Sequence, residues 1–126
     1  MSLDISVYRK EGENSVILKL SGHLDTETHS QLTEKGKQAL SGSLTGLVLD
    51  LEALEYISSM GISSIMMLKK MCDEKNAGFV MVNVPAHIEK VFEIVKALPD
   101  VRVFESMQEA DRYFMEIQKR AKGESR

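Results

Sequence analysis

The sequence predicts one α/β domain with a mixed, mostly parallel sheet of four or five strands and about four helices. Short apolar runs typical of buried strands alternate along the chain with segments whose apolar residues recur at helical spacing. The first two apolar runs lie close enough for a hairpin, whereas the later ones are separated by lengths that suit crossovers between parallel strands. With 126 residues, the chain can form one real core but not two ordinary domains.

The N-terminal segment predicts a β-hairpin. Ile5 and Val7 alternate with polar neighbours, and a turn-rich segment at residues 11–14 separates them from an apolar run at residues 16–20. Such a short separation favours an antiparallel pair, so the sheet is expected to open with one antiparallel strand.

A helix is predicted after this hairpin. Residues 21–26 are expected to break the second strand, and Asp25 or Thr26 can cap the helix that carries Leu32. Gly42 and Gly46 mark its far end, because glycine commonly follows the last helical turn.

The middle of the chain predicts a central strand and a second helix. Residues 47–51 form an almost unbroken apolar run of the kind buried on both faces of a sheet. A polar turn containing Glu52 and Glu55 is expected next. The helix is predicted to start at Ser58 and Ser59, whose hydroxyls can cap free backbone N–H groups.

The second helix carries four methionines, which can fill a core or form an adaptable surface. Met66 and Met71 follow the spacing of the neighbouring isoleucines and are expected in the core. Met60 and Met67 fall off that face, so we expect them to be exposed and available for a partner contact.

The remaining third of the chain is predicted to continue the alternation of strands and helices. Residues 79–84 predict a strand closed by Pro85, and a helix is expected from about Ala86 to a point before Pro99. Residues 101–104 predict a short last strand.

A final helix is expected beyond this strand. Ser106 and Glu109 have the spacing of a capping box at its start. We therefore place the domain at residues 1–121 and expect residues 122–126 to form a disordered tail.

Composition excludes several classes of protein. The net charge is -3 with both signs interspersed, whereas nucleic-acid binders concentrate Lys and Arg on one face. No apolar run has a length that would span a membrane, and the single cysteine, Cys72, rules out an internal disulfide. These features predict a cytoplasmic protein whose partners include neither nucleic acid nor a membrane, with Cys72 buried.

No catalytic or ligand-binding constellation is present in the sequence. The three histidines, His23 in an expected loop and His29 and His87 at expected helix starts, have no ligand spacing. Nucleotide-binding glycine loops and a GxSxG motif are missing, and Glu52 and Glu55 are expected to be solvated. We therefore predict a protein that is not an enzyme, with no catalytic residue, metal or cofactor.

The serine pair has two interpretations on chemistry alone. A hydroxyl at a helix start lies beside free backbone N–H groups and the positive end of the helix dipole, where a phosphate would be electrostatically favoured. The alternative is a simple helix cap that needs no modification.

Three segments in order along the chain, residues 22–25, 49–62 and 103–110, together resemble the STAS family. This family comprises bacterial anti-sigma factor antagonists (anti-anti-sigma factors) and related domains of sulfate transporters. The resemblance implies a STAS-type fold over nearly the whole chain. It also implies that a serine at the start of the second helix is phosphorylated by the anti-sigma factor, which is itself a serine kinase, and that a serine phosphatase removes this phosphate.

Alignment on Gly61 places the family's phosphorylated serine at Ser59, with Ser58 as the alternative. Ser58 stands where the family has an aspartate, and Met60 replaces a smaller polar residue. Asp25 matches the aspartate of the family's GxLD loop, although a helix cap is an equally good interpretation of it. The implied partner-binding residues are Asp25, Ser58, Ser59 and Met60.

The resemblance predicts an anti-sigma factor antagonist that sequesters its kinase when the serine is unmodified and releases it when the serine is phosphorylated. The alternative is an unphosphorylated STAS scaffold or transporter-accessory domain, which the departures at Ser58 and Met60 favour.

Overall fold

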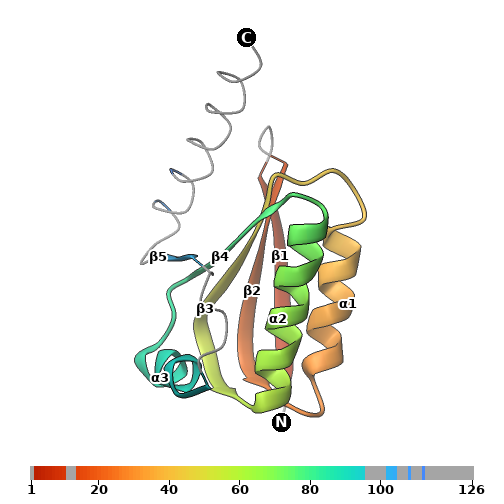
Figure 1. Cartoon of the computed structure of the whole chain (residues 1–126). Helices are drawn as coiled ribbons and strands as arrows, with labels where there is room; N and C mark the ends of the chain where they lie inside the picture. Colours follow the sequence, from red (N-terminus) through yellow and green to blue (C-terminus); the bar gives the residue numbers. More distant parts are fainter. Residues whose placement is uncertain (1, 11–13, 96–101, 105–107, 109–111, 113–126) are drawn as a thin grey trace.

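The computed structural model describes residues 2–10, 14–95, 102–104, 108 and 112 (Figure 1). Its strands and helices alternate after the opening pair of strands, as the sequence predicts. In chain order the elements are β1 (Leu3–Lys10), β2 (Ser15–Leu24), α1 (His29–Ala39), β3 (Gly46–Ile57), α2 (Ser59–Glu74), β4 (Gly78–Val82), α3 (Ala86–Val95) and β5 (Arg102–Phe104).

The five strands form one sheet in the order β1-β2-β3-β4-β5. β1 pairs with β2 in antiparallel orientation, and every later pair is parallel. This arrangement confirms the predicted mixed, mostly parallel sheet with an antiparallel start. Of the predicted final helix, the structure describes only residues 108 and 112, and both are helical. Its predicted capping residues Ser106 and Glu109, the domain boundary at 121 and the tail at residues 122–126 lie outside the described residues.

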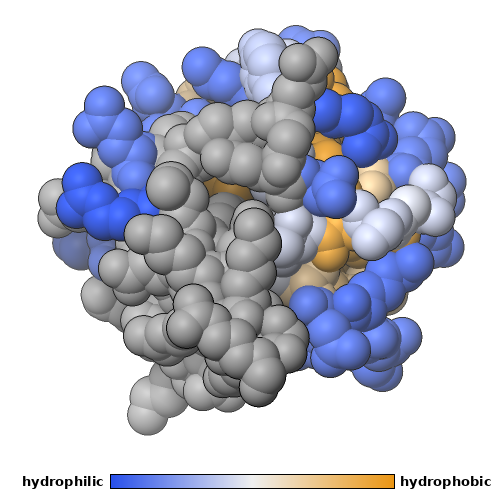
Figure 2. Space-filling view, turned by 90° about the horizontal axis from the view of Figure 1, so that it is seen from above, coloured by the Kyte–Doolittle hydropathy of each residue, from blue (hydrophilic) through white to orange (hydrophobic). Residues whose placement is uncertain are grey.

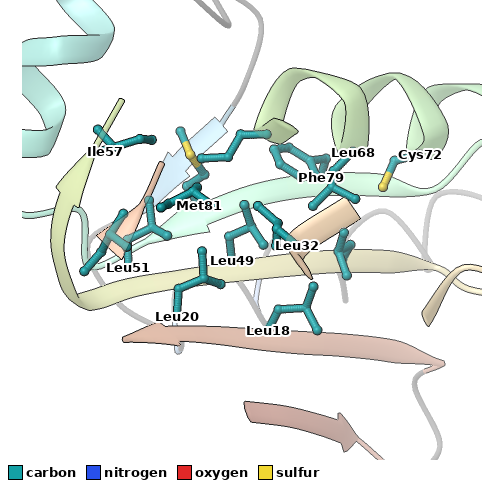
Figure 3. Packing of buried hydrophobic residues seen from close by; sticks show 14 of the residues in the cluster. Leu18, Leu20, Leu32, Leu49, Leu51, Ile57, Leu68, Cys72, Phe79 and Met81 are labelled. Atoms are coloured by element: carbon teal, nitrogen blue, oxygen red, sulfur yellow. The ribbon is translucent and has the colours of Figure 1, made fainter. Parts of the chain in front are cut away.

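α1 and α2 lie side by side on one face of the sheet (Figure 1). Between these helices and the sheet lies an apolar core, in which leucines of β2 and β3 face leucines of the two helices (Figure 3). The alternation of strand side chains explains this, because every second residue of a strand points to the same face. The labelled examples are Leu18 and Leu20 of β2, Leu49 and Leu51 of β3, Leu32 of α1 and Leu68 of α2.

Gly36 lets the two helices approach closely. A Cβ atom at this position would overlap the Leu68 side chain of α2. Cys72, further along α2, is buried as predicted, and burial, with a smaller contribution from the charge of Asp73, raises the pKa of its thiol to about 12. At neutral pH this thiol is therefore protonated and unreactive.

Two of the strands extend further than the sequence predicts. The expected break at residues 21–26 and the expected turn at Glu52 and Glu55 are wrong, because β2 and β3 stay paired to their ends. Their last pair joins Leu24 to Ile57, after two register shifts that follow Lys19 and Gly22. His23, expected in a loop, therefore lies within β2.

Gly22 makes the extension of β2 possible. It has a φ of 104°, a value that side chains disfavour, and a Cβ atom there would overlap the carbonyl oxygen of Ser2. The glycine that resembles a strand breaker in the sequence instead allows the strand to shift register and continue.

Candidate functional site

Ser58 is the N-cap of α2 and lies where the end of β3, the start of α2 and the end of β2 meet. Its backbone is extended, with φ of -100° and ψ of 175°, and its hydroxyl accepts a hydrogen bond of 3.2 Å from the Gly61 N–H. Its own N–H donates to the carbonyl oxygen of Leu24 at 2.9 Å, so the start of α2 is tied to the end of β2. The predicted helix start at the serine pair is confirmed, with Ser58 as the capping residue.

The contribution of this cap can be measured with a pair of substitutions. Ser58→Ala removes the hydroxyl that satisfies the Gly61 N–H and should lower the free energy of unfolding by about 1 kcal/mol. Ser59→Ala is the matched control; it should change stability by less than about 0.5 kcal/mol, because Ser59 is exposed. Urea unfolding of both variants tests this, and equal losses would contradict the assignment of Ser58 as the cap.

Ser59 is the first residue of α2 and is exposed. Two large apolar side chains lie near it in the sequence and are also exposed, Met60 to 40% and Tyr56, the penultimate residue of β3, to 48%. The hydroxyl of Ser59 is thus accessible to another protein, within a segment that also offers apolar contacts.

The division of the α2 methionines into exposed and buried residues differs from the prediction at one position. Met60 and Met67 are exposed, as expected, and Met71 is partly buried against the core. Met66, which we expect in the core, is 46% exposed. The buried face of α2 instead includes Ser64, whose hydroxyl donates to the Gly61 carbonyl at 2.6 Å and so needs no water.

Asp25 organises the turn between β2 and α1. Its Oδ1 accepts hydrogen bonds from the N–H groups of Glu27 at 3.0 Å and Thr28 at 3.2 Å, and the Thr28 hydroxyl lies 3.1 Å away. The same hydroxyl lies 2.7 Å from the His23 carbonyl oxygen, to which it can donate. The helix begins at His29 with Thr28 at the N-cap position, so the predicted capping by Asp25 or Thr26 is wrong. Asp25 supports the turn before the helix instead.

This turn lies beside the start of α2. Asp25 follows Leu24, whose carbonyl accepts the Ser58 N–H, so the two segments of the sequence motif meet at one end of the sheet. Partial desolvation opposes ionisation of Asp25, but hydrogen bonds from Glu27 and Thr28 outweigh it and lower the pKa of the carboxyl.

Acid titration should reveal the contribution of this charge to stability. Because the pKa of Asp25 in the fold lies below its ordinary value of 3.8, the ionised group stabilises the fold above that value, and this stabilisation is lost as pH falls through the lowered pKa. Asp25→Asn keeps an acceptor oxygen but removes the charge. We expect the variant to melt below the wild type at neutral pH and the difference to close in strong acid. A difference that is unchanged across this range would contradict the expectation.

A polar and aromatic group at the same end of the sheet was not predicted. His23 Nε2 lies 3.4 Å from Glu55 Oε2, and the rings of His23 and Tyr56 are 5.6 Å apart. His87, at the start of α3, places Nε2 2.8 Å from the Glu55 carbonyl oxygen. The spacing of these residues in the sequence does not predict that they are neighbours in the fold. Their proximity follows from the extension of β2 and β3, which sets His23 opposite Tyr56.

The described residues contain no group of three or more His, Cys, Asp or Glu side chains that could hold a metal ion. None of the helices in the described ranges is long and apolar enough to cross a membrane. Figure 2 shows the end of the molecule that lies away from the start of α2. The described surface there is mainly hydrophilic, with apolar residues visible between polar ones.

Comparison with known families and structures identifies the fold. The model of the STAS domain matches residues 5–110. The chain belongs to the STAS domain family. The predicted resemblance is thereby confirmed, and the serine pair and Asp25 lie within the matched range of this STAS domain.

Solved structures resemble this STAS domain over most of their length. An anti-sigma factor antagonist from Mycobacterium paratuberculosis matches with a TM-score of 0.79 at 17% identity, over 90% of this chain and 95% of that one. The Bacillus cell fate determinant SpoIIAA in its phosphorylated form matches with a TM-score of 0.67 at 19% identity, over 87% and 99% of the chains. The unphosphorylated form of SpoIIAA, an anti-sigma factor antagonist, gives 0.66 at 18% identity over 95% and 99%.

A sulfate transporter family protein from Wolinella succinogenes also matches, with a TM-score of 0.74 at 12% identity over 84% of this chain and 88% of that one. At these identities the likeness establishes a shared fold.

Proposed function

We propose that this STAS domain is an anti-sigma factor antagonist controlled by phosphorylation of Ser59. In the unmodified state it binds a serine kinase that acts as the anti-sigma factor, and phosphorylation releases that kinase. The observation that carries the proposal is the exposed hydroxyl of Ser59 on the first residue of α2, in a chain whose fold is shared with SpoIIAA in both phosphorylation states.

The different surroundings of the two serines favour Ser59 as the acceptor. The Ser58 hydroxyl accepts the Gly61 N–H and is partly buried, so phosphorylation there would disrupt the cap. Ser59 is exposed and has no capping role in α2. Ser58 remains the alternative acceptor.

A phosphate on Ser59 would act mainly on the partner. It adds about -1.5 to -2 charges at neutral pH, and the N-terminus of a helix stabilises such a charge by about 0.3 to 1 kcal/mol. The domain itself should therefore keep its fold. A partner surface shaped for a neutral hydroxyl would have to bury the dianion without a matching cation, which weakens binding.

The partner surface that we propose includes Asp25, Ser58, Ser59 and Met60, and the structure suggests adding Tyr56. Tyr56 and Met60 supply exposed apolar area, while Asp25 supplies a charge fixed by its turn. The chemistry of phosphate transfer belongs to the kinase, and that of phosphate removal to a serine phosphatase. The domain acts by binding, and we place it in the cytoplasm with these enzymes.

Phosphate mapping tests the proposal directly. The protein is incubated with its cognate kinase and ATP, and modified peptides are identified by mass spectrometry. We expect one phosphate on Ser59, its loss in Ser59→Ala, and normal modification of Ser63→Ala, which alters an exposed serine of the same helix. An active kinase that leaves both Ser58 and Ser59 unmodified would contradict the proposed switch.

A second candidate function is that of an unphosphorylated STAS scaffold or transporter-accessory domain. Ser58 and Met60 depart from the antagonist pattern, and the fold also matches a sulfate transporter family protein. Pull-down of partners separates the two candidates. A serine kinase among the bound proteins favours the switch, and transport components favour the alternative.

A further inference from the structure

Three thioether side chains lie on the surface of α2. Met60, Met66 and Met67 are 40%, 46% and 51% exposed, whereas Met81 of β4 is 2% exposed within the core. Peroxides oxidise methionine at its sulfur atom, and exposure of the side chain governs how easily they reach it. The chain thus carries accessible methionines on one helix and a protected methionine that can serve as an internal reference.

Met60 differs from the other exposed methionines in its position. It follows Ser59 directly at the start of α2, while Met66 and Met67 lie about 9 and 10.5 Å further along the helix axis than Met60. Met60 is also absent from the buried apolar cluster. A change in its polarity would therefore alter the surface around Ser59 and leave the packing of the core intact.

We propose that Met60 is an oxidative modification site, at which conversion of the thioether to the sulfoxide weakens kinase binding independently of phosphorylation. A peroxide transfers one oxygen atom to the sulfur; the sulfur is oxidised, and hydrogen peroxide is reduced to water. The inference rests on the proposed function, because it assumes that the kinase contacts the Ser59 surface. The sulfoxide replaces an apolar side chain with a polar one, which disfavours its burial against an apolar partner contact.

The first part of the test measures oxidation alone. The folded protein is treated with dilute hydrogen peroxide for increasing times, and the gain of one oxygen at each methionine is followed by peptide mass spectrometry. We expect Met60 to react at a rate similar to Met66 and Met67 and at least about tenfold faster than buried Met81. A Met60 that reacts as slowly as Met81 would overturn the inference.

The second part measures binding by calorimetry after the peroxide has been removed, so that the kinase itself is never oxidised. We expect the oxidised wild type to bind about tenfold more weakly than the untreated protein. Met60→Leu, which conserves volume and apolar character, should bind equally before and after peroxide. The double variant Met66→Leu, Met67→Leu is the matched control and should lose affinity as the wild type does. A methionine sulfoxide reductase should restore binding.

The possible failures are distinguishable. A Met60→Leu variant that loses as much affinity as the wild type would overturn this inference alone. An untreated wild type that does not bind the kinase would overturn the proposed function and this inference together.

Discussion

Ser59→Asp is expected to weaken binding to the kinase about hundredfold, a change of about 2.8 kcal/mol in binding free energy. The carboxylate places a permanent negative charge at an exposed position where the proposed partner meets a neutral hydroxyl. The thermal unfolding midpoint should change little, because a negative charge is favourable at a helix N-terminus. Calorimetry and thermal unfolding on the same samples give both results.

Ser63→Asp is the matched control for this experiment. Ser63 is also an exposed serine of α2, but it lies one turn beyond Ser59, where the charge of the helix terminus is no longer concentrated. We expect Ser63→Asp to bind more tightly than Ser59→Asp. Equal affinity of Ser59→Asp and the wild type would contradict the electrostatic switch.

Gly61→Ala is expected to lower the free energy of unfolding by about 2 to 3 kcal/mol. A Cβ atom at Gly61 would lie 2.5 Å from the Leu24 carbonyl oxygen and 2.9 Å from side-chain carbon atoms of Leu24 and Ile57. The carbonyl belongs to the backbone at the end of β2 and cannot move without disturbing its hydrogen bond to the Ser58 N–H. This steric cost exceeds the gain of about 1 kcal/mol that alanine normally gives over glycine inside a helix.

Gly42→Ala provides the comparison. A Cβ atom at Gly42 has no neighbouring atom within 4 Å, so we expect its stability to stay within about 0.5 kcal/mol of the wild type. Urea unfolding of both glycine variants separates the steric effect at Gly61 from the general effect of replacing glycine. Similar stabilities of the two variants would contradict the expectation that the close approach of α2 to β2 requires glycine at position 61.

The sequence was sufficient to predict the architecture and the start of α2. The apolar run at residues 47–51 indicates a buried strand because the surrounding fold covers both faces. The serine pair indicates a helix start because a hydroxyl can satisfy a backbone N–H that has no partner within the helix. Both are local rules, and the structure follows them.

The ends of β2 and β3 could not be predicted in the same way. Gly22 and the glutamates at 52 and 55 are residues that usually interrupt strands, and only the pairing of the two strands with each other overrides that preference. The same long-range pairing brings His23, Glu55 and Tyr56 together. The spacing of residues in the sequence therefore gave no basis for predicting this part of the candidate site.

Met66 shows a second limit of pattern analysis. Met66 lies four residues after Ile62, a spacing that predicts burial, but beyond Ile62 the buried face of α2 passes through Ser64, Ile65 and Leu68. A serine fits there because its hydroxyl bonds to the helix backbone. Which of two adjacent helical residues faces the core depends on the rotation of the helix, which is set by packing against β3, β4 and α1.

The hydrogen bond from the Ser58 amide to the Leu24 carbonyl is made by main-chain atoms only. Its formation does not depend on the identity of the exposed side chains at Tyr56, Ser59 and Met60. Substitutions at these three positions should therefore change the proposed partner surface without loosening the attachment of α2 to β2. The scaffold can thus be kept unchanged while the surface that we propose for the partner is altered.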